Sequence, residues 1–343
     1  MKLTKNDINN ILVGSSLLGT GGGGRFDLAK KIATKIKNPI WLETIDNISE
    51  NDLIVTTFMV GGLKKKGDLG TGIAKSIGKL KEILNREIKY LIPVEIGPTA
   101  VINLLNIASK TNLSVIDGDL VGYRSAPEIY VEAITLNNVN RLPIVAVNLE
   151  GDTIVLSETE SIKKIETILR TFSAQSKTEV YVAGYPVYKR QIKNFFGNGS
   201  LSYALKVGEC LTNNKKNTLL KNLSEIMIIY LAQGQIISQE EKDNNGFTSG
   251  KLTIDSGIDM YEVIYNNEYL VLLKNNTVLL TSPDSILLLD VNQRRGINNS
   301  ENNKGKQVYI LAKKAIPAWR TMEGKKLFSP ISLGFDYQQK LLK

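Results

Sequence analysis

The stretch DLIVTTFMV, residues 52–60, is an unbroken apolar run with the length of one strand. The runs IKYLIPVE (88–95) and LSVID (113–117) have the same character. Continuous apolar runs of this length are typical of strands that are buried on both faces of a parallel sheet. Helical patterns fit between them, at about 70–86 and 98–110. This β-α-β-α-β order predicts a parallel sheet with right-handed crossovers.

The segments around these runs extend the same pattern. Before them, NDINNILVGSSLL (6–18) predicts an amphipathic helix capped near Asn6 or Asp7, and a second helix follows at about 26–36. After them, PIVAVNL (143–149) and TIVLSE (153–158) predict a strand pair, and SETESIKKIETILRTFSAQS (157–176) predicts a helix.

The pattern changes in the second half of the chain. Helices are expected in SLSYALKVGECL (200–211) and LLKNLSEIMIIYLA (219–232). From about residue 234, short alternating strands separated by turn residues predict a mainly antiparallel region. NQRRGINNSENNKGKQ (292–307) is expected to be a polar surface loop. We predict an α/β domain with a mostly parallel sheet over 1–175 and a β-rich (α+β) domain over 176–343.

Composition excludes several kinds of catalytic site. The sequence has no histidine, so Ser–His and Cys–His catalysis and the usual zinc and non-haem iron sites are excluded. Its one cysteine, Cys210, lies among apolar neighbours and is expected to be an inert buried thiol. Carboxylate, lysine, tyrosine and serine chemistry remains, with room for a hard, oxygen-liganded cation.

Charge and targeting signals bear on location and partners. The net charge is +9, but lysine is scattered, and the run Lys64–Lys66 has no interleaved aromatic residues, so nucleic-acid binding is not expected. No apolar run reaches the roughly 20 residues that span a bilayer. With a single cysteine and no signal-peptide core, we expect a cytoplasmic protein without membrane contact.

The glycine-rich stretch LGTGGGGR (18–25) is the first candidate binding element. It formally matches the dinucleotide fingerprint, but a helix precedes it where the fingerprint requires a strand. It also lacks the Gly-Lys-Ser/Thr of a phosphate loop. Five glycines within Gly19–Gly24 allow backbone N–H groups to approach a ligand closely. We expect Gly21, Gly22, Gly23 and Gly24 to contact a ligand; a plain helix–helix turn is the alternative.

The second candidate is VIDGDLVGYRSAPE (115–128). Asp117, Asp119, Gly122 and Glu128 stand at positions 1, 3, 6 and 12 of an EF-hand calcium loop. The stretch follows a strand, however, and carries Val121 at position 5, so a calcium loop is disfavoured.

Strand ends give a better interpretation of the same residues. Open α/β sheets bind ligands beyond the carboxyl ends of their strands, and Glu95 follows the preceding strand. We therefore expect one cleft to be formed by Glu95, Asp117, Asp119, Arg124 and Glu128. The alternative is a set of capping residues with a structural Arg124–Glu128 ion pair. NNEYL (266–270) reads most simply as a turn; Asn267, Glu268, Asp284 and Trp319 join the cleft if the β domain closes over it.

The ordered set of motifs resembles the S-methyl thiohydantoin desulfurase-like family, long catalogued as a domain of unknown function and often found near hydantoinases. The resemblance covers nearly the whole chain, through LGTGGGG (18–24), EIGP (95–98), DGDLVGYRSAPE (117–128), GSLSYALKVG (199–208), GFTSG (246–250), NNEYL (266–270), SPDSILLLD (282–290), WRTMEG (319–324) and PISLGFDY (330–337). It implies an α/β N-terminal domain, a β-rich C-terminal domain, and hydrolysis of a five-membered cyclic thioimidate to a hydantoin and methanethiol.

For that reaction we assign roles to the candidate residues. Asp119 is the general base, Arg124 orients it or meets charge that develops on the ring, and Glu95 or Glu128 is the acid or the acceptor for the ring N–H. The N–H groups of Gly21–Gly24 bind the ring carbonyl, and Asp117, Asn267 and Glu268 complete the substrate contacts.

Three rival functions stay open at this stage. They are hydrolysis of a different hydantoin or lactam ring, a carboxylate-bound Mg²⁺ or Mn²⁺ site, and a non-catalytic or partner-dependent subunit of a hydantoinase- or oxoprolinase-type enzyme. The sequence requires no cofactor, and we expect a small heterocyclic substrate and a homo-oligomer.

Overall fold

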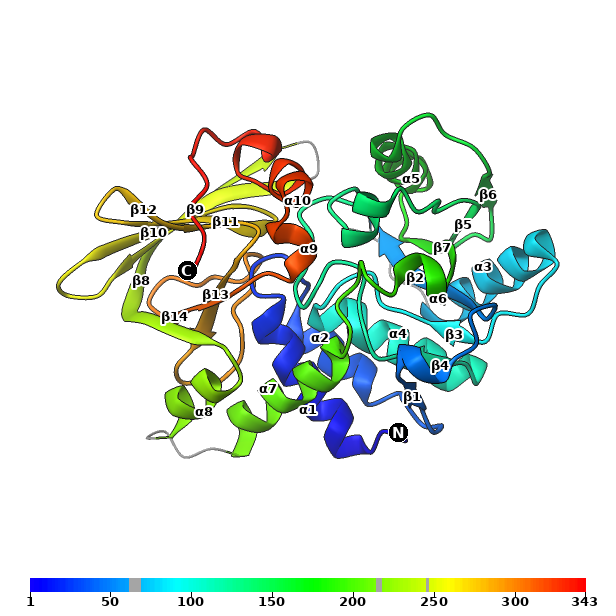
Figure 1. Cartoon of the computed structure of the whole chain (residues 1–343), viewed down its shortest axis with the longest axis horizontal. Coiled ribbons are helices and arrows are strands. Elements are labelled where there is room, and N and C mark those ends of the chain that lie inside the picture. Colours follow the sequence, from blue (N-terminus) through cyan, green and yellow to red (C-terminus); the bar gives the residue numbers. More distant parts are fainter. Residues whose placement is uncertain (62–68, 214–217, 245–246) are drawn as a thin grey trace.

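The three apolar runs form neighbouring strands in the computed structural model, which describes residues 1–61, 69–213, 218–244 and 247–343 (Figure 1). The first sheet has the order β1-β4-β3-β2-β7-β5-β6. Its strands are β1 (Leu42–Glu43), β2 (Leu53–Val60), β3 (Tyr90–Leu91), β4 (Ser114–Ile116), β5 (Ile144–Asn148), β6 (Thr153–Leu156) and β7 (Val180–Tyr188).

This sheet is mixed, which corrects the prediction of a mostly parallel sheet. The pairs β1–β4, β4–β3 and β3–β2 are parallel, whereas β2–β7, β7–β5 and β5–β6 are antiparallel. The difference comes from β7, a strand that the sequence analysis did not predict. β7 lies after the proposed boundary at residue 175, yet it pairs with both β2 and β5 in the first sheet.

Helices cover the first sheet and join it to the second (Figure 1). The long helices expected from the sequence are present, as are short ones after β7 and after β14. Their bounds are α1 (Lys5–Leu18), α2 (Phe26–Ala33), α3 (Leu69–Leu84), α4 (Pro98–Thr111), α5 (Ile162–Ser176), α6 (Lys189–Ile192), α7 (Ser200–Asn213), α8 (Leu219–Glu225), α9 (Pro317–Arg320) and α10 (Met322–Leu327).

Helices α1 and α7 approach each other through glycine. A Cβ on Gly14 would lie 1.8 Å from the Ala204 carbonyl oxygen, and one on Gly208 would lie 1.8 Å from the Asn10 carbonyl oxygen. Only glycine permits this backbone contact. The N-cap of α1 is Thr4, two or three residues before the predicted cap, because Thr4 and Asp7 form a reciprocal capping box.

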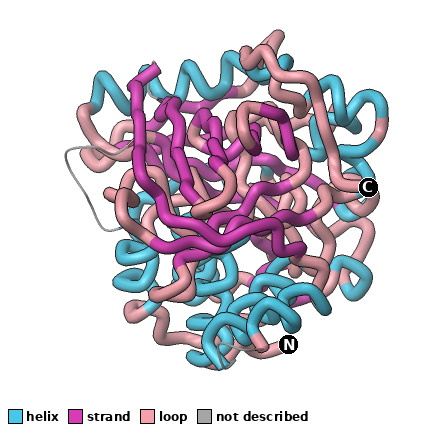
Figure 2. The backbone as a smooth tube through the Cα atoms, turned by 90° about the vertical axis from the view of Figure 1, so that its left-hand side faces the viewer, coloured by secondary structure: helices cyan, strands magenta, loops and turns pink. Residues whose placement is uncertain are grey.

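The second sheet is antiparallel, as predicted, with the order β12-β11-β10-β9-β8-β14-β13 (Figure 2). Its strands are β8 (Ile229–Asn244), β9 (Phe247–Asp255), β10 (Met260–Asn266), β11 (Glu268–Lys274), β12 (Thr277–Thr281), β13 (Ser285–Asp290) and β14 (Gln307–Lys313). The helix predicted over 219–232 ends earlier, at Glu225. The apolar residues that follow it pair with β14 as the start of β8.

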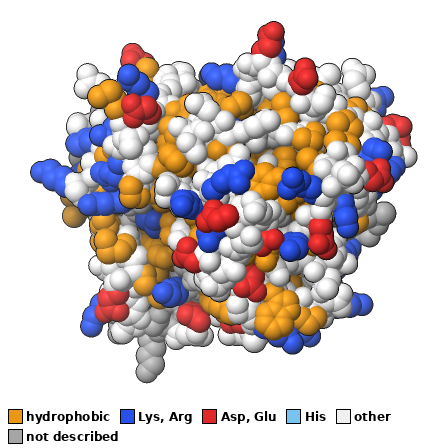
Figure 3. Space-filling model, turned by 45° about the vertical axis from the view of Figure 1, so that its right-hand side comes forward, with side chains coloured by type: hydrophobic (Ala, Val, Ile, Leu, Met, Phe, Trp, Pro, Cys, Tyr) orange, Lys and Arg blue, Asp and Glu red, His pale blue; other side chains and the backbone are white. Residues whose placement is uncertain are grey.

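The helices and the surface charges bear on whether the protein contacts a membrane or a nucleic acid. Within the described ranges, no helix is both long and apolar enough to span a membrane. Figure 3 shows basic side chains dispersed among acidic and apolar ones over one face. The run Lys64–Lys66, considered for nucleic-acid binding, lies outside the described residues.

Candidate functional site

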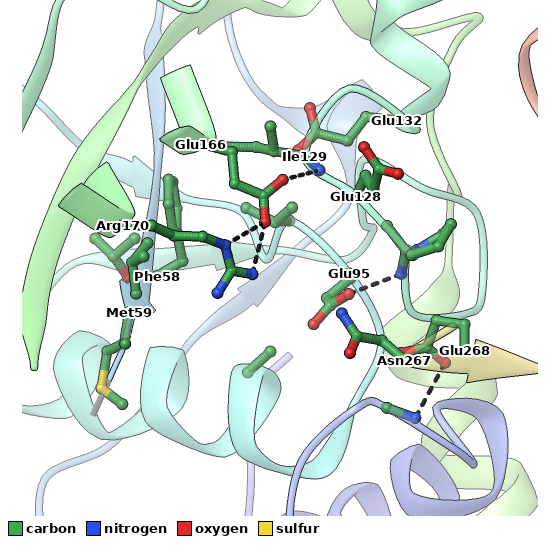
Figure 4. Close-up of a pocket in the computed structure, with 18 of the residues that line it drawn as sticks. Phe58, Met59, Glu95, Glu128, Ile129, Glu132, Glu166, Arg170, Asn267 and Glu268 are labelled. Carbon is green, nitrogen blue, oxygen red and sulfur yellow. Dashed lines mark hydrogen bonds and ion pairs between the residues drawn. The ribbon is translucent and has the colours of Figure 1, made fainter. Parts of the chain in front are cut away.

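A pocket of about 360 Å³ lies between the carboxyl end of β2, the loops after β3 and β4, helix α5, and the β10–β11 turn (Figure 4). Its position beyond the ends of parallel strands is where open α/β sheets bind ligands. Five carboxylates and one arginine line it: Glu95, Glu128, Glu132, Glu166, Glu268 and Arg170. The remaining wall is mostly apolar and includes Phe58, Met59, Val60 and Ile129.

Glu95 and Glu268 come from different sheets and face the same pocket. Figure 4 shows them grouped with Asn267 on one side, with Glu166 and Arg170 opposite. One oxygen of Glu95 accepts a hydrogen bond from the Ala126 N–H at 2.8 Å. Oε2 of Glu268 accepts from the Ser125 hydroxyl at 2.6 Å and from the Gly22 N–H at 3.3 Å. Each carboxyl is thus held through its Oε2, and both residues line the pocket.

The environment brings both pKa values close to neutral pH. Burial raises the pKa of Glu95 to about 7, and the charges of Glu132, Asp119 and Glu166 add to the rise. Burial raises the pKa of Glu268 to about 8, and the neighbouring Glu95 contributes in the same direction. Burial and nearby carboxylates disfavour the charged form, so both carboxyls have pKa values above that of a free glutamate.

Three other charged residues of the pocket, Glu132, Glu166 and Arg170, are tied to partners. Arg170 donates to Glu166 Oε1 at 2.7 Å, and the other oxygen of Glu166 accepts from the Ile129 N–H. Glu132 is fully buried and accepts from Arg141 and from the Tyr185 hydroxyl. These contacts fix the wall opposite Glu95. Four residues that line or support the pocket were not predicted from the sequence: Glu132, Glu166, Arg170 and Tyr185. Of these, Glu166 and Arg170 are four residues apart on a helix, a spacing that indicates an ion pair.

The glycine loop reaches the pocket through Gly22, whereas its neighbours hold the loop in place. The Gly21 N–H donates to the Ile297 carbonyl, and the Asn299 N–H donates to the Gly21 carbonyl. Asn298 donates to the Gly24 carbonyl at 3.1 Å. The segment 292–307, predicted to be a polar surface loop, therefore packs inward here, because its buried asparagines pair with a glycine backbone that has no side chains of its own to offer.

The close packing around Gly22 predicts that a larger side chain at this position destabilises the protein. A Cβ on Gly22 would lie 2.2 Å from Glu268 Oε1 and 2.8 Å from the Asn267 carbonyl oxygen. The carboxylate can rotate away but the backbone carbonyl cannot, so Gly22→Ala is expected to destabilise the fold by about 1–3 kcal/mol and to displace Glu268. Gly78→Ala is the matched control, since nothing lies within 4 Å of its Cβ. Urea unfolding of both variants measures the difference; equal midpoints would contradict this packing.

Asp117 and Asp119 are placed away from the pocket. Asp117 caps α7: one oxygen accepts from the Leu201 and Ser202 N–H groups, and the other accepts from the Ser202 hydroxyl. Asp119 is completely buried and accepts from the N–H groups of Val121, Gly122 and Tyr123. Asp117 therefore organises the start of α7 and Asp119 the loop that leads to Ser125, and neither residue lines the pocket.

Arg124, which we expected in the cleft, is buried away from the pocket, and its contacts are not those of the alternative Arg124–Glu128 ion pair. Arg124 donates to the carbonyls of Ser125, Pro283 and Asp284, and it stacks on the Phe328 ring at 4.6 Å. It links the α/β domain to the β domain. Trp319 does the same by donating to the Val121 carbonyl.

Asp119→Asn separates loop organisation from chemistry. An amide has one acceptor oxygen and places an NH₂ group where backbone N–H groups now point, so we expect a loss of about 1–3 kcal/mol in folding free energy. Turnover per folded molecule should change less than about tenfold, because Asp119 does not reach the pocket. Thermal unfolding combined with activity corrected for the folded fraction tests this. A stable variant whose kcat has fallen more than about a hundredfold would show that Asp119 takes part in catalysis.

No group of three or more acidic or cysteine side chains within the described ranges is arranged to hold a metal ion. Cys210 is half-buried, and burial raises the pKa of its thiol.

Comparison with known proteins places this arrangement in a family. The model of the S-Me-THD-like N-terminal domain matches residues 6–158, and that of the S-Me-THD-like C-terminal domain matches residues 160–342. The chain belongs to the S-Me-THD-like family. The resemblance seen in the ordered motifs is thereby confirmed, and the two matched regions of this S-Me-THD-like protein meet close to the start of α5.

A solved structure has the same fold. The crystal structure of a protein from Chromobacterium violaceum aligns with a TM-score of 0.83 over 100% of both chains, at 19% sequence identity. This identity shows the fold alone. No curated protein matches the chain.

Proposed function

We propose that this S-Me-THD-like protein hydrolyses a small five-membered cyclic amide or thioimidate, and that an S-methyl thiohydantoin is its substrate class. The observation that carries the proposal is the pair Glu95 and Glu268. They come from separate domains, line the same pocket, and have pKa values near 7 and 8. Family membership supports the ring type, and with no histidine in the sequence the carboxylates that line the pocket are the acid–base groups we propose.

The proposed mechanism divides one proton transfer between the two carboxyls. Glu95, the more acidic, is ionised and takes a proton from water as the water oxygen bonds to the ring carbon that bears sulfur. Glu268, still protonated, gives its proton to the ring nitrogen of the C=N bond. Each group is expected to contribute about 10²–10⁴-fold to the rate.

The second half-reaction restores both groups. The hydroxyl of the tetrahedral carbon gives its proton to the Glu268 carboxylate as the C=O bond re-forms, and the C–S bond breaks while Glu95 returns its proton to the departing sulfur. The products are methanethiol and the ring amide; the N–H proton came from Glu268, and the hydroxyl proton replaces it there. Water has thus supplied the carbonyl oxygen and the two protons that balance the products.

The test uses the purified protein with S-methyl thiohydantoins and with plain hydantoins, followed by a thiol-reactive dye and by ring-opening chromatography. Thiol release with an intact ring supports desulfuration. Ring opening without thiol release assigns the pocket to amide hydrolysis instead. No change in any compound would contradict independent catalysis and favour a subunit that acts only with a hydantoinase-like partner.

A further inference from the structure

A second, smaller cavity opens beside the main pocket. It has a volume of about 170 Å³ and shares with the pocket the lining residues Gly22, Thr57, Phe58, Met59, Glu95 and Ala100. We call this cavity the annex. It extends from Glu95 towards α4, where Thr99 and Asn103 line it. A molecule bound against Glu95 can therefore occupy both spaces.

Two buried polar side chains that line the annex each have an oxygen without a hydrogen-bond partner. Asn103 is 7% exposed; its Nδ2 donates to the Met59 sulfur at 3.8 Å, but its Oδ1 makes no hydrogen bond. Thr57 is 6% exposed and its hydroxyl is likewise unpaired. A buried unpaired polar group costs about 1–3 kcal/mol. Both side chains line the same small space, which makes a ligand the natural partner for them.

The chemistry around the annex selects the kind of group that fits. Asn103 Oδ1 requires a hydrogen-bond donor, and the Thr57 hydroxyl can donate or accept. Thr99 and Ala100 stand in the first turn of α4, where backbone N–H groups have no intrahelical carbonyl and favour an acceptor. A carboxylate would leave Asn103 Oδ1 without a donor and would lie beside Glu95. A primary carboxamide supplies both the donor and the acceptor without charge.

We propose that the annex binds the uncharged carboxamide head of a substituent on the substrate. The reacting ring lies against Glu95 and Glu268 in the main pocket, and the substituent passes Glu95 into the annex. Its NH₂ group donates to Asn103 Oδ1, and its carbonyl accepts at the start of α4 and from Thr57. The ring placement rests on the proposed function; the carboxamide site rests on the annex alone.

Three hydantoins of matched shape test the head group, with carbamoylmethyl, carboxymethyl and 2-methylpropyl substituents at the carbon between the ring nitrogen and carbonyl. Calorimetric titration should give a Kd for the carbamoylmethyl compound that is lower than the other two by about tenfold or more. Asn103→Leu should abolish that preference. Equal affinity for all three compounds, or an unchanged preference in Asn103→Leu, would overturn the proposal.

Asn106 provides a matched control on the same helix. Its Oδ1 is also buried and unpaired, at 2% exposure, but it lines neither the pocket nor the annex. Asn106→Leu should keep the carboxamide preference. Both leucine variants should fold at least as stably as the parent, because replacing an unpaired buried amide by an apolar group of similar shape is nearly neutral or stabilising.

A ringless probe separates this proposal from the proposed function. If no hydantoin binds, the ring assignment fails while the annex is still testable with propionamide, soaked into crystals of the protein. Propionamide within hydrogen-bonding distance of Asn103 Oδ1 supports the site. An annex that holds only water under those conditions, in the parent and in Asn103→Leu alike, overturns it.

Discussion

Glu95→Gln is expected to lower kcat by about 10²–10⁴-fold while leaving the fold intact. Its carboxyl lines both the pocket and the annex, and burial raises its pKa to about 7, which suits a base that works at neutral pH. Glutamine keeps the oxygen that accepts from the Ala126 N–H but cannot accept a proton from water. Steady-state thiol release, compared with the thermal unfolding midpoint, measures chemistry and stability separately.

The pH dependence gives the same prediction a second readout. In the parent, kcat/KM should rise as Glu95 ionises near pH 7 and fall as Glu268 loses its proton near pH 8. The rising limb should disappear in Glu95→Gln and the falling limb in Glu268→Gln. If the two variants lose the same limb, the assignment of base and acid is wrong.

Glu166→Gln is the matched control for this substitution. Glu166 lines the same pocket, but its two oxygens are occupied by Arg170 and by the Ile129 N–H. We expect a change in kcat of less than about tenfold. A loss in Glu166→Gln as large as that in Glu95→Gln would show that activity depends on the total charge of the pocket rather than on Glu95.

The sequence predicts the framework well where burial determines the pattern. The runs at 52–60, 88–95 and 113–117 are continuous because both faces of their strands are covered, so their position and parallel order could be predicted. The strand β7 could not be predicted in the same way. Its Gly184 and Pro186 interrupt the run, and it pairs with β2 only because the chain returns from α5 in the opposite direction. The sheet is therefore mixed because of the direction in which the chain returns from α5, which the residue pattern of β7 does not show.

The candidate site shows a comparable limit. The rule that ligands bind beyond strand ends leads to Glu95, which lies in the pocket, and equally to Asp119, which does not. What separates them is the backbone after each residue: Val121, Gly122 and Tyr123 turn their N–H groups onto Asp119. Such a turn is not readable from residue types.

Partners from distant segments are harder still to predict. Glu268 reads as part of a turn, yet the β domain delivers it to Gly22 and Ser125, at separations of 246 and 143 residues. The asparagines of 292–307 look like solvent-exposed loop residues, but Asn303 is fully buried. The role of the asparagines in 292–307 depends on the backbone of the glycine loop, which has no side-chain donors of its own.

Arg141→Met is expected to lower the free energy of unfolding by about 3–5 kcal/mol, the usual result of leaving one member of a buried ion pair alone. The side chains of Arg141 and Glu132 are 1% and 0% exposed and meet at 2.8 Å. Arg141 also donates to the Thr135 hydroxyl and stacks on Tyr185, which lines the pocket. Methionine retains much of the volume, so the loss reports on charge and hydrogen bonding.

The direction of the pH effect follows from Glu132. Burial raises its pKa to about 7, against the opposing effect of Arg141, so removing Arg141 raises the folded-state value further. A carboxyl with a raised pKa contributes its full stability below the unfolded value, ordinarily near 4.5, and loses it as the pH rises through the folded value. Arg141→Met should therefore be more destabilising at pH 8 than at pH 5.

The double variant Glu132→Gln/Arg141→Met decides whether the loss comes from the stranded charge. The substituted glutamine side chain would still accept from the Tyr185 hydroxyl and would carry no charge. Urea unfolding should therefore show at least half of the lost stability restored, with little difference between pH 5 and pH 8. If the double variant is as unstable as Arg141→Met at both pH values, the guanidinium acts through packing and its Thr135 contact. In that case the charge balance of Glu132 and Glu166, which face Glu95 across the pocket, does not depend on the Glu132–Arg141 ion pair.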